Sequence, residues 1–209
     1  MLLAAGADVN ALSGFSSVAG RLRLSALHLA VMEDRRQILR LLLQNQADVD
    51  LPTSEGQTAL MIATTFDRPE IFDELMLWNA DVNQIDDDGN TCLLVAAQYN
   101  RINFAHVLVE VGADLNVRGE GGRTALMVAV IERRTTIVGE LVEAGADVNV
   151  RDDGEATALH WAAELGRHRL VPLLLGAGAD RTLVDGEGNT PRDVAVAARR
   201  NRIVALLDA

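Results

Sequence analysis

The stretch that decides the fold runs from Gly145 to Ala162 and reads GADVNVRDDGEATALHWA. Its first part, Asp147-Val148-Asn149 followed by a glycine-containing segment, predicts an extended excursion and a tight turn. Its second part places Thr157 directly before an apolar run. There the hydroxyl is suited to accept a hydrogen bond from a free backbone N–H of the first helical turn. The stretch therefore predicts a loop that leads into a capped helix.

Both parts of this stretch recur along the chain with one spacing. The dipeptide Ala-Asp recurs with its aspartate at Asp8, Asp48, Asp81, Asp114, Asp147 and Asp180. A hydroxyl residue recurs at Ser25, Thr58, Thr91, Thr124, Thr157 and Thr190. The aspartates are 40 residues apart once and then 33 residues apart four times, and the hydroxyl residues keep the interval of 33. Two ladders with the same period indicate an internal repeat.

Each repeat is expected to contain two helices. A residue that breaks the first apolar run recurs at one phase, at Asp34, Asp67, Asn100, Arg133, Gly166 and Arg199. A second apolar run follows, such as Ile137 to Val142, and a glycine such as Gly145 ends it. Helix, turn, helix and hairpin-like loop therefore form one unit. Because a single unit cannot bury its apolar face alone, neighbouring units must stack.

These motifs resemble the ankyrin repeat. The family's Thr-Pro-Leu-His-x-Ala motif is similar to Ser25–Ala30 and Thr157–Ala162, and its Gly-Ala-Asp-Val-Asn motif is met at Gly6–Asn10 and Gly145–Asn149. The motif proline remains only at Pro191. The resemblance implies an all-α ankyrin-repeat solenoid of stacked helix-turn-helix pairs with hairpin-like loops. It also implies a protein-protein interaction module that binds through the concave face of the first helices and through the loop tips.

We expect a single ankyrin-repeat domain over residues 1–209. The first interval exceeds the period by 40 − 33 = 7 residues, which predicts an insertion at residues 13–19. The expected order is a half repeat at 1–12, the insertion, full repeats at 20–52, 53–85, 86–118, 119–151 and 152–184, and a terminal helical pair at 185–209. The chain starts inside what should be a second helix. We therefore expect either a longer natural protein or a partner that covers this edge.

The charge of the chain narrows the classes of partner. The formal net charge is −11 at pH 7, so a phosphate backbone would be repelled and no nucleic acid is expected as a partner. An acidic surface attracts a basic protein, although it also serves solubility alone. No apolar run reaches the length of a membrane span, so no membrane partner is expected. We expect a monomer.

Cysteine usage and the basic residues bear on compartment and source. Cys92 is the only cysteine, which excludes an internal disulfide and fits a reducing compartment. The segment from Met1 to Ala5 lacks the basic region of a secretory signal. We expect a cytoplasmic protein, with a secreted effector that lacks a classical signal peptide as the alternative. All 19 basic side chains are arginine, which favours a GC-rich and bacterial source.

No catalytic, cofactor or metal constellation is evident in the sequence. His28 and His160 are 132 residues apart, four times the period, whereas a metal or acid–base role would need them close together. The resemblance implies that this histidine stabilises the adjacent loop by hydrogen bonds. His106, His168 and Cys92 have no spacing suited to a metal site or a nucleophilic dyad. We therefore expect no enzyme activity, no cofactor and no metal.

Two further ladders carry charge. Carboxylates gather at the expected loop tips, and Asp87, Asp88, Glu120 and Asp153 are the ones predicted to steer a basic partner, with solvated turns as the alternative. Arginines recur at Arg35, Arg68, Arg101, Arg134, Arg167 and Arg200, thickened by Arg36, Arg133, Arg169, Arg199 and Arg202. This row would either grip carboxylates and phosphates or be solvated and locally paired.

Apolar residues at an outward phase of the first helices complete the predicted partner-binding site. The anchors are Phe66, Tyr99, Ile131 and Leu165, with Gln98 and Glu132 beside them. The alternative is that these side chains pack against neighbouring helices. Trp161 is expected in the core. The predicted function is to bind a protein partner, and the rival interpretation is a regulatory or substrate-recruiting part of a larger enzyme.

Overall fold

Helix pairs joined by loops make up most of the chain, and the computed structural model describes residues 7–17 and 20–209. The half repeat expected at 1–12 and the insertion expected at 13–19 lie partly outside these residues. The chain separates into two compact units, Met1–Val95 and Ala96–Ala209. Helix α5 (Cys92–Gln98) begins in the first unit and ends in the second.

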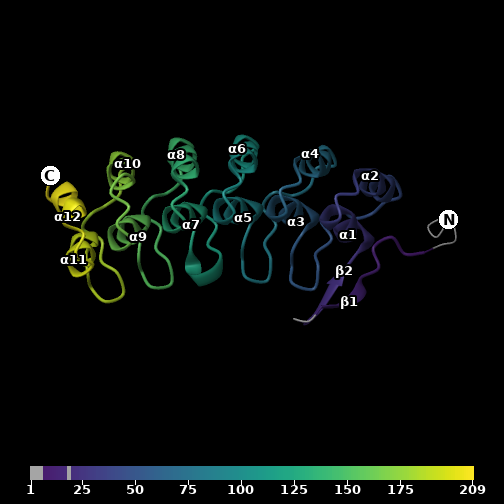
Figure 1. The fold of residues 1–209 in the computed structure, drawn as a ribbon, viewed down its shortest axis with the longest axis horizontal. Coiled ribbons are helices and arrows are strands. Elements are labelled where there is room, and N and C mark those ends of the chain that lie inside the picture. Colours follow the sequence, from purple (N-terminus) through teal and green to yellow (C-terminus); the bar gives the residue numbers. More distant parts are fainter. Residues whose placement is uncertain (1–6, 18–19) are drawn as a thin grey trace. The chain divides into compact units, whose positions relative to one another are not determined.

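The first unit contains a β-hairpin and two helix pairs (Figure 1). Its elements are β1 (Ser13–Ser17), β2 (Gly20–Leu24), α1 (Ala26–Met32), α2 (Arg36–Gln44), α3 (Ala59–Thr65) and α4 (Pro69–Leu77). The two strands pair antiparallel, with Ser13 opposite Leu24. Helix α1 packs on α2 and α3, and α4 packs on α2 and α3, so first and second helices form two adjoining layers.

The second unit continues the same arrangement. Its elements are α6 (Ile102–Glu110), η2 (Glu120–Gly122), α7 (Ala125–Ile131), α8 (Thr135–Glu143), α9 (Ala158–Glu164), α10 (Val171–Gly176), α11 (Pro191–Ala197) and α12 (Asn201–Asp208). First helices α7, α9 and α11 contact one another in turn, and second helices α6, α8, α10 and α12 do likewise. The helical repeat predicted from the ladders is confirmed, and among the described residues only β1 and β2 are strands.

The hydroxyl ladder caps the first helices as predicted. Thr58, Thr91 and Thr124 each accept a hydrogen bond at 3.4 Å from the backbone N–H three residues later. Thr190 does the same at 3.3 Å and also donates from its hydroxyl to Asp193, which completes a capping box. The cap fixes where each first helix begins, because it satisfies one of the N–H groups that the helix leaves free.

The Asp-x-Asn motif links successive repeats. The Asp147 carboxylate accepts the N–H of Asn149 at 2.8 Å, which closes a local turn. The Asn149 side chain then accepts the N–H of Asp180, the corresponding residue of the next repeat, also at 2.8 Å. The same bond runs from Asp147 to Asn116. The ladder therefore supplies hydrogen bonds between repeats as well as turns within them.

Neighbouring loop tips are also bonded to each other within each unit. The N–H of Asp87 donates to Glu55, that of Asp153 to Gly121 and that of Gly186 to Gly154, over 2.9–3.1 Å. In the first unit the N–H of Ser54 donates to the Arg23 carbonyl, so strand β2 takes the place of the first tip. The tips thus form a continuous edge within each unit.

Gly122 is required for this contact in the second unit. Its φ is +71°, and a Cβ added there would lie 2.8 Å from the backbone nitrogen of Asp153. We expect Gly122→Ala to lower the free energy of unfolding by about 1–3 kcal/mol, because the backbone would be strained and the tip displaced. Urea unfolding followed by circular dichroism measures the change. Gly145→Ala is the matched control: its φ is +85°, but open space surrounds it. Equal losses in the two variants would show that tip packing contributes nothing.

Candidate partner-binding surface

The ten residues predicted to bind a partner divide between the two units. Phe66, Asp87 and Asp88 belong to the first unit. The other seven belong to the second unit and are Gln98, Tyr99, Glu120, Ile131, Glu132, Asp153 and Leu165. All ten are exposed except Ile131 and Leu165, which are half-buried.

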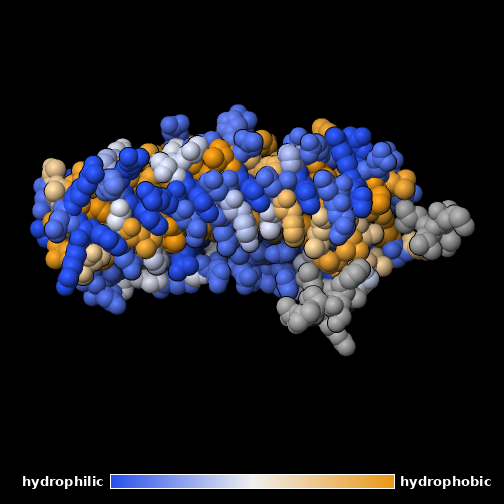
Figure 2. Space-filling model, viewed as in Figure 1, coloured by the Kyte–Doolittle hydropathy of each residue, from blue (hydrophilic) through white to orange (hydrophobic). Residues whose placement is uncertain are grey.

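The predicted apolar anchors lie at the ends of first helices. Phe66 and Leu165 are the C-caps of α3 and α9, Tyr99 follows α5, and Ile131 ends α7. Phe66 is 46% exposed and Tyr99 47%, so neither is buried against a neighbouring helix. On the face shown in Figure 2, hydrophobic residues are separated by hydrophilic ones. Exposed aromatic rings at such positions are suited to anchor a partner.

The predicted acidic residues lie on the loop tips, apart from the helix ends. Asp153 pairs with Arg118 at 2.8 Å, whereas Asp87 and Asp88 extend into solvent from the tip at residues 86–90. Glu120 begins η2 in the second unit. The apolar and acidic sets therefore occupy different parts of each repeat.

A pocket of about 320 Å³ lies between two loop tips and two first helices of the second unit. We call it the tip pocket. The lining residues that matter for its chemistry are Asp152, Trp161, Glu164, Asp185, Glu187 and Val194. Four carboxylates and an indole ring thus surround one concave space, which the sequence did not predict.

Trp161 is half-buried in this pocket, so its expected place in the core is wrong. Its indole Nε1 donates to Asp152 at 2.8 Å, and the Arg123 guanidinium lies 5.1 Å from the ring centre. Asp152, only 4% exposed, also accepts the N–H groups of Gly154 and Ala156 at 2.9 Å. These bonds hold the indole at the pocket wall. The available signal was an aromatic residue at a phase where the earlier repeats have Leu29, Ile62, Val95 and Val128.

Asp185 forms the opposite wall of the tip pocket. Burial alone would raise the pKa of its carboxyl, but the N–H groups of Asn189 and Glu187 donate to it and hold that pKa below its ordinary value. The carboxylate is therefore charged over the whole neutral range. The pocket carries a lasting negative charge.

The two motif histidines are structural, as the resemblance implied. His28 accepts the N–H of Ser25 at Nδ1 (3.0 Å), and its Nε2 lies 2.9 Å from the Leu51 carbonyl. His160 makes the corresponding contacts with Thr157 and with the Asn189 carbonyl. Both rings are buried. Each ring therefore ties a helix start to the next loop, and both of its nitrogens are occupied.

Burial lowers the pKa of both His28 and His160, although hydrogen bonds to the Leu51 and Asn189 carbonyls act in the opposite direction. The unfolded chain takes up protons below about pH 6.5 that these buried rings resist, so stability present above that pH is lost as the pH falls. We expect the free energy of unfolding to decrease between about pH 7.5 and 5.5. Urea titrations at several pH values measure the slope. A His28→Leu, His160→Leu variant, whose residues match Leu94, should be less stable at pH 7.5 and have a flatter slope. An unchanged slope would contradict this assignment.

The arginine row is paired locally with backbone carbonyls. The pairs are Arg68 with Met32 (3.3 Å), Arg134 with Gln98 (3.1 Å), Arg167 with Ile131 (2.6 Å) and Arg200 with Glu164 (3.0 Å). Each acceptor is the last residue of the first helix in the preceding repeat. A guanidinium at a helix C-terminus satisfies a free carbonyl and opposes the negative end of the helix dipole. These four arginines therefore connect repeats.

Cys92 and the remaining titratable groups offer no reactive centre among the described residues. Burial raises the pKa of the Cys92 thiol to about 12, and the thiol lies 2.9 Å from the Thr64 hydroxyl. In the described part of the chain, no three His, Cys, Asp or Glu side chains are grouped to hold a metal ion.

Comparison with known families agrees with this architecture. The family model described as Ankyrin repeats (3 copies) matches residues 1–86 and 68–152, and the model described as Ankyrin repeats (many copies) matches residues 141–195. Among curated proteins, none matches the chain significantly. Within residues 7–17 and 20–209, no helix is long and apolar enough to cross a membrane. The family matches span most of the sequence, and the chain therefore belongs to the ankyrin repeat family.

Proposed function

We propose that this ankyrin repeat protein binds a partner protein with exposed arginine or lysine side chains, through its loop tips and first helices. Ankyrin repeats are generally protein-protein interaction modules and are typically non-catalytic. The observation that carries the proposal is the tip pocket, because its four carboxylates have no arginine among the lining residues.

The chemistry of the tip pocket suits a basic side chain. A partner guanidinium or ammonium group would meet Glu164, Asp185 and Glu187 while its methylene stem packs on Trp161 and Val194. Arg123 already lies over the Trp161 ring, an example of the guanidinium–indole stacking that a partner residue would extend.

The predicted anchors and steering residues belong to the same proposal. Tyr99, Ile131 and Leu165 would bury apolar surface against the partner, and Phe66 would do so in the first unit. Asp87, Asp88, Glu120 and Asp153 would attract a basic partner before contact, with the rate falling as salt rises. The proposal includes a monomeric chain in a reducing, cytoplasmic compartment, supported by the single buried cysteine.

Affinity capture from a lysate of the source organism tests the proposal. We expect the native chain to retain a basic protein that a Phe66→Ala, Tyr99→Ala variant loses. Leu77→Ala, Val111→Ala is the matched control, since it also removes one exposed apolar side chain from each unit, but on second helices. Equal retention of the same protein by all three chains would refute the aromatic anchors.

A further inference from the structure

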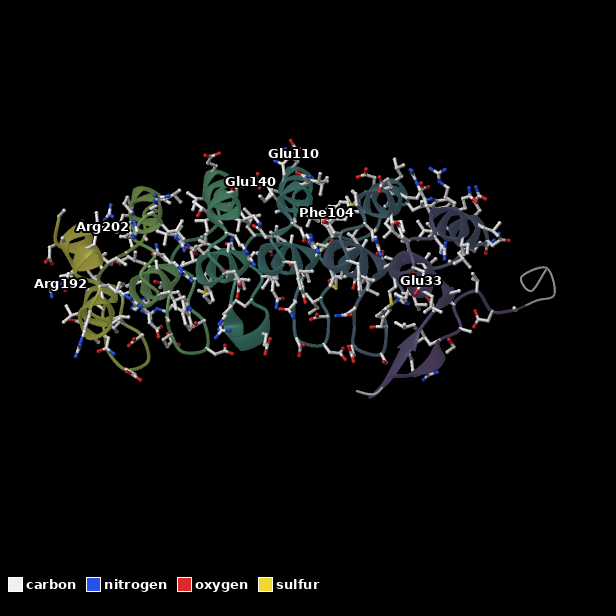
Figure 3. All side chains as sticks on the ribbon, viewed as in Figure 1. Glu33, Phe104, Glu110, Glu140, Arg192 and Arg202 are labelled. Carbon is white, nitrogen blue, oxygen red and sulfur yellow. The ribbon has the colours of Figure 1, made fainter. Side chains whose placement is uncertain are left out.

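Two adjoining pockets lie at the turns between first and second helices in the second unit, with volumes of about 260 and 280 Å³. We call them the turn pockets. Both are open to solvent, and Gly166 and His168 line both of them. Arg133, Arg167 and Arg169 line the first, and Arg199, Arg200 and Arg202 line the second. Arg202 lies on α12 (Figure 3). The two pockets together form a trough with six arginines.

No carboxylate lines either turn pocket. Arg167 and Arg200 donate to backbone carbonyls and hold repeats together. The guanidinium groups of Arg133, Arg169, Arg199 and Arg202 have no hydrogen-bond or ion-pair partner among the described residues. Four positive charges are thus unneutralised in a chain whose net charge is −11.

The repeat fold does not require these four arginines. At the phase of Arg133 and Arg199, the earlier repeats have Asp34, Asp67 and Asn100. At the phase of Arg169 and Arg202, they have Gln37, Glu70, Asn103 and Thr136. The extra arginines therefore occur only around the turn pockets, which indicates a role in binding.

We infer that the turn pockets bind a phosphorylated segment of a protein. Guanidinium groups recognise phosphate oxygens through paired N–H donors, and arginine clusters are a recurrent way to bind phosphorylated motifs. An open trough would leave most of a small metabolite in solvent, whereas small-molecule sites enclose most of their ligand. A long nucleic acid would be repelled by the surrounding negative charge. The site has the opposite charge to the tip pocket and does not rest on the proposed function.

Fluorescence anisotropy with a labelled Ala/Ser peptide carrying two phosphoserines tests the inference. We expect it to bind at least about tenfold more tightly than the unphosphorylated peptide, since charged hydrogen bonds contribute about 1.5–3 kcal/mol each. Arg133→Asn, Arg169→Gln should weaken binding about tenfold or more. These substitutions introduce residues that the chain already has at the same phases, Asn100 and Gln37.

Arg118→Gln, Arg151→Gln is the matched control, because it removes two arginines from the same unit but outside the turn pockets. It should bind the phosphopeptide as the native chain does. If the first variant fails to fold, Arg199→Asn, Arg202→Gln tests the second pocket in the same way. The inference is overturned by equal binding of the two peptides, by equal losses in control and test variants, or by inorganic phosphate that competes as tightly as the peptide. Tighter binding of duplex DNA through the same arginines would also overturn it.

Discussion

Replacement of Phe72 by alanine is expected to lower the free energy of unfolding of the first unit by about 3–5 kcal/mol. Phe72 on α4 is fully buried and is the largest side chain in the core, which otherwise consists mainly of small aliphatic residues. Its removal would lose apolar burial and leave a cavity between stacked helices that have little freedom to collapse.

The two tryptophans allow this loss to be assigned to one unit. Trp78 lies in the first unit and Trp161 in the second, so urea unfolding in a Trp161→Phe background reports on Trp78 alone. Leu77→Ala on the same helix is the control, because Leu77 is 75% exposed and should change stability by less than about 0.5 kcal/mol. Similar effects of the two substitutions would contradict the packing of α4 described above.

Removal of the Trp161 side chain is expected to weaken binding of the captured basic partner by about 2–4 kcal/mol, the effect of losing an aromatic hot spot. Trp161→Ala removes the wall of the tip pocket and releases Asp152, whereas Trp161→Phe keeps a ring and loses only the N–H bond. The phenylalanine variant should therefore lie between the native chain and Trp161→Ala. Isothermal titration calorimetry with the purified partner measures the three affinities.

Trp78→Ala is the matched control for this series, since Trp78 is a partly exposed tryptophan at the end of α4. It should leave the affinity unchanged. An unchanged affinity in Trp161→Ala would remove the tip pocket from the binding surface, whereas equal losses in the two alanine variants would indicate a general loss of stability.

Features set by local chemistry could be predicted from the sequence. The caps of the first helices depend on a hydroxyl residue and the three residues after it, so Thr58 and Thr124 could be assigned directly. The loop geometry of Asp147 and Asn149 is equally local. The ladder period of 33 then implied stacking, because every repeat repeats the same apolar face.

Features that depend on which groups meet after stacking could not be predicted in full. The spacing of the arginine row was visible, but its acceptors are carbonyls 36 residues earlier, as for Arg167 and Ile131. Leu165 was grouped with the acidic tips, yet it lines a turn pocket beside Arg133. The strands β1 and β2 were predicted only as an insertion, because an irregular interval reveals extra residues but not their pairing.

The same reasoning explains the error at Trp161. Its phase is occupied by aliphatic residues in earlier repeats, and the indole was placed in the core by analogy. An indole needs a partner for its N–H, however, and Asp152 provides one at the pocket wall. A polar partner nine residues earlier on the neighbouring loop becomes apparent only when loop and helix are packed together.

Hydrogen–deuterium exchange of the complex with its captured partner tests the central claim most directly. The account predicts added protection at the loop tips and first helices of the second unit, over residues 118–123, 152–165 and 185–194. The segments at 133–136 and 166–170, which border the turn pockets, should exchange as in the free chain apart from the Leu165 end of α9. Protection confined to α6, α8 and α10, with none at the tips, would contradict a partner site built around the tip pocket.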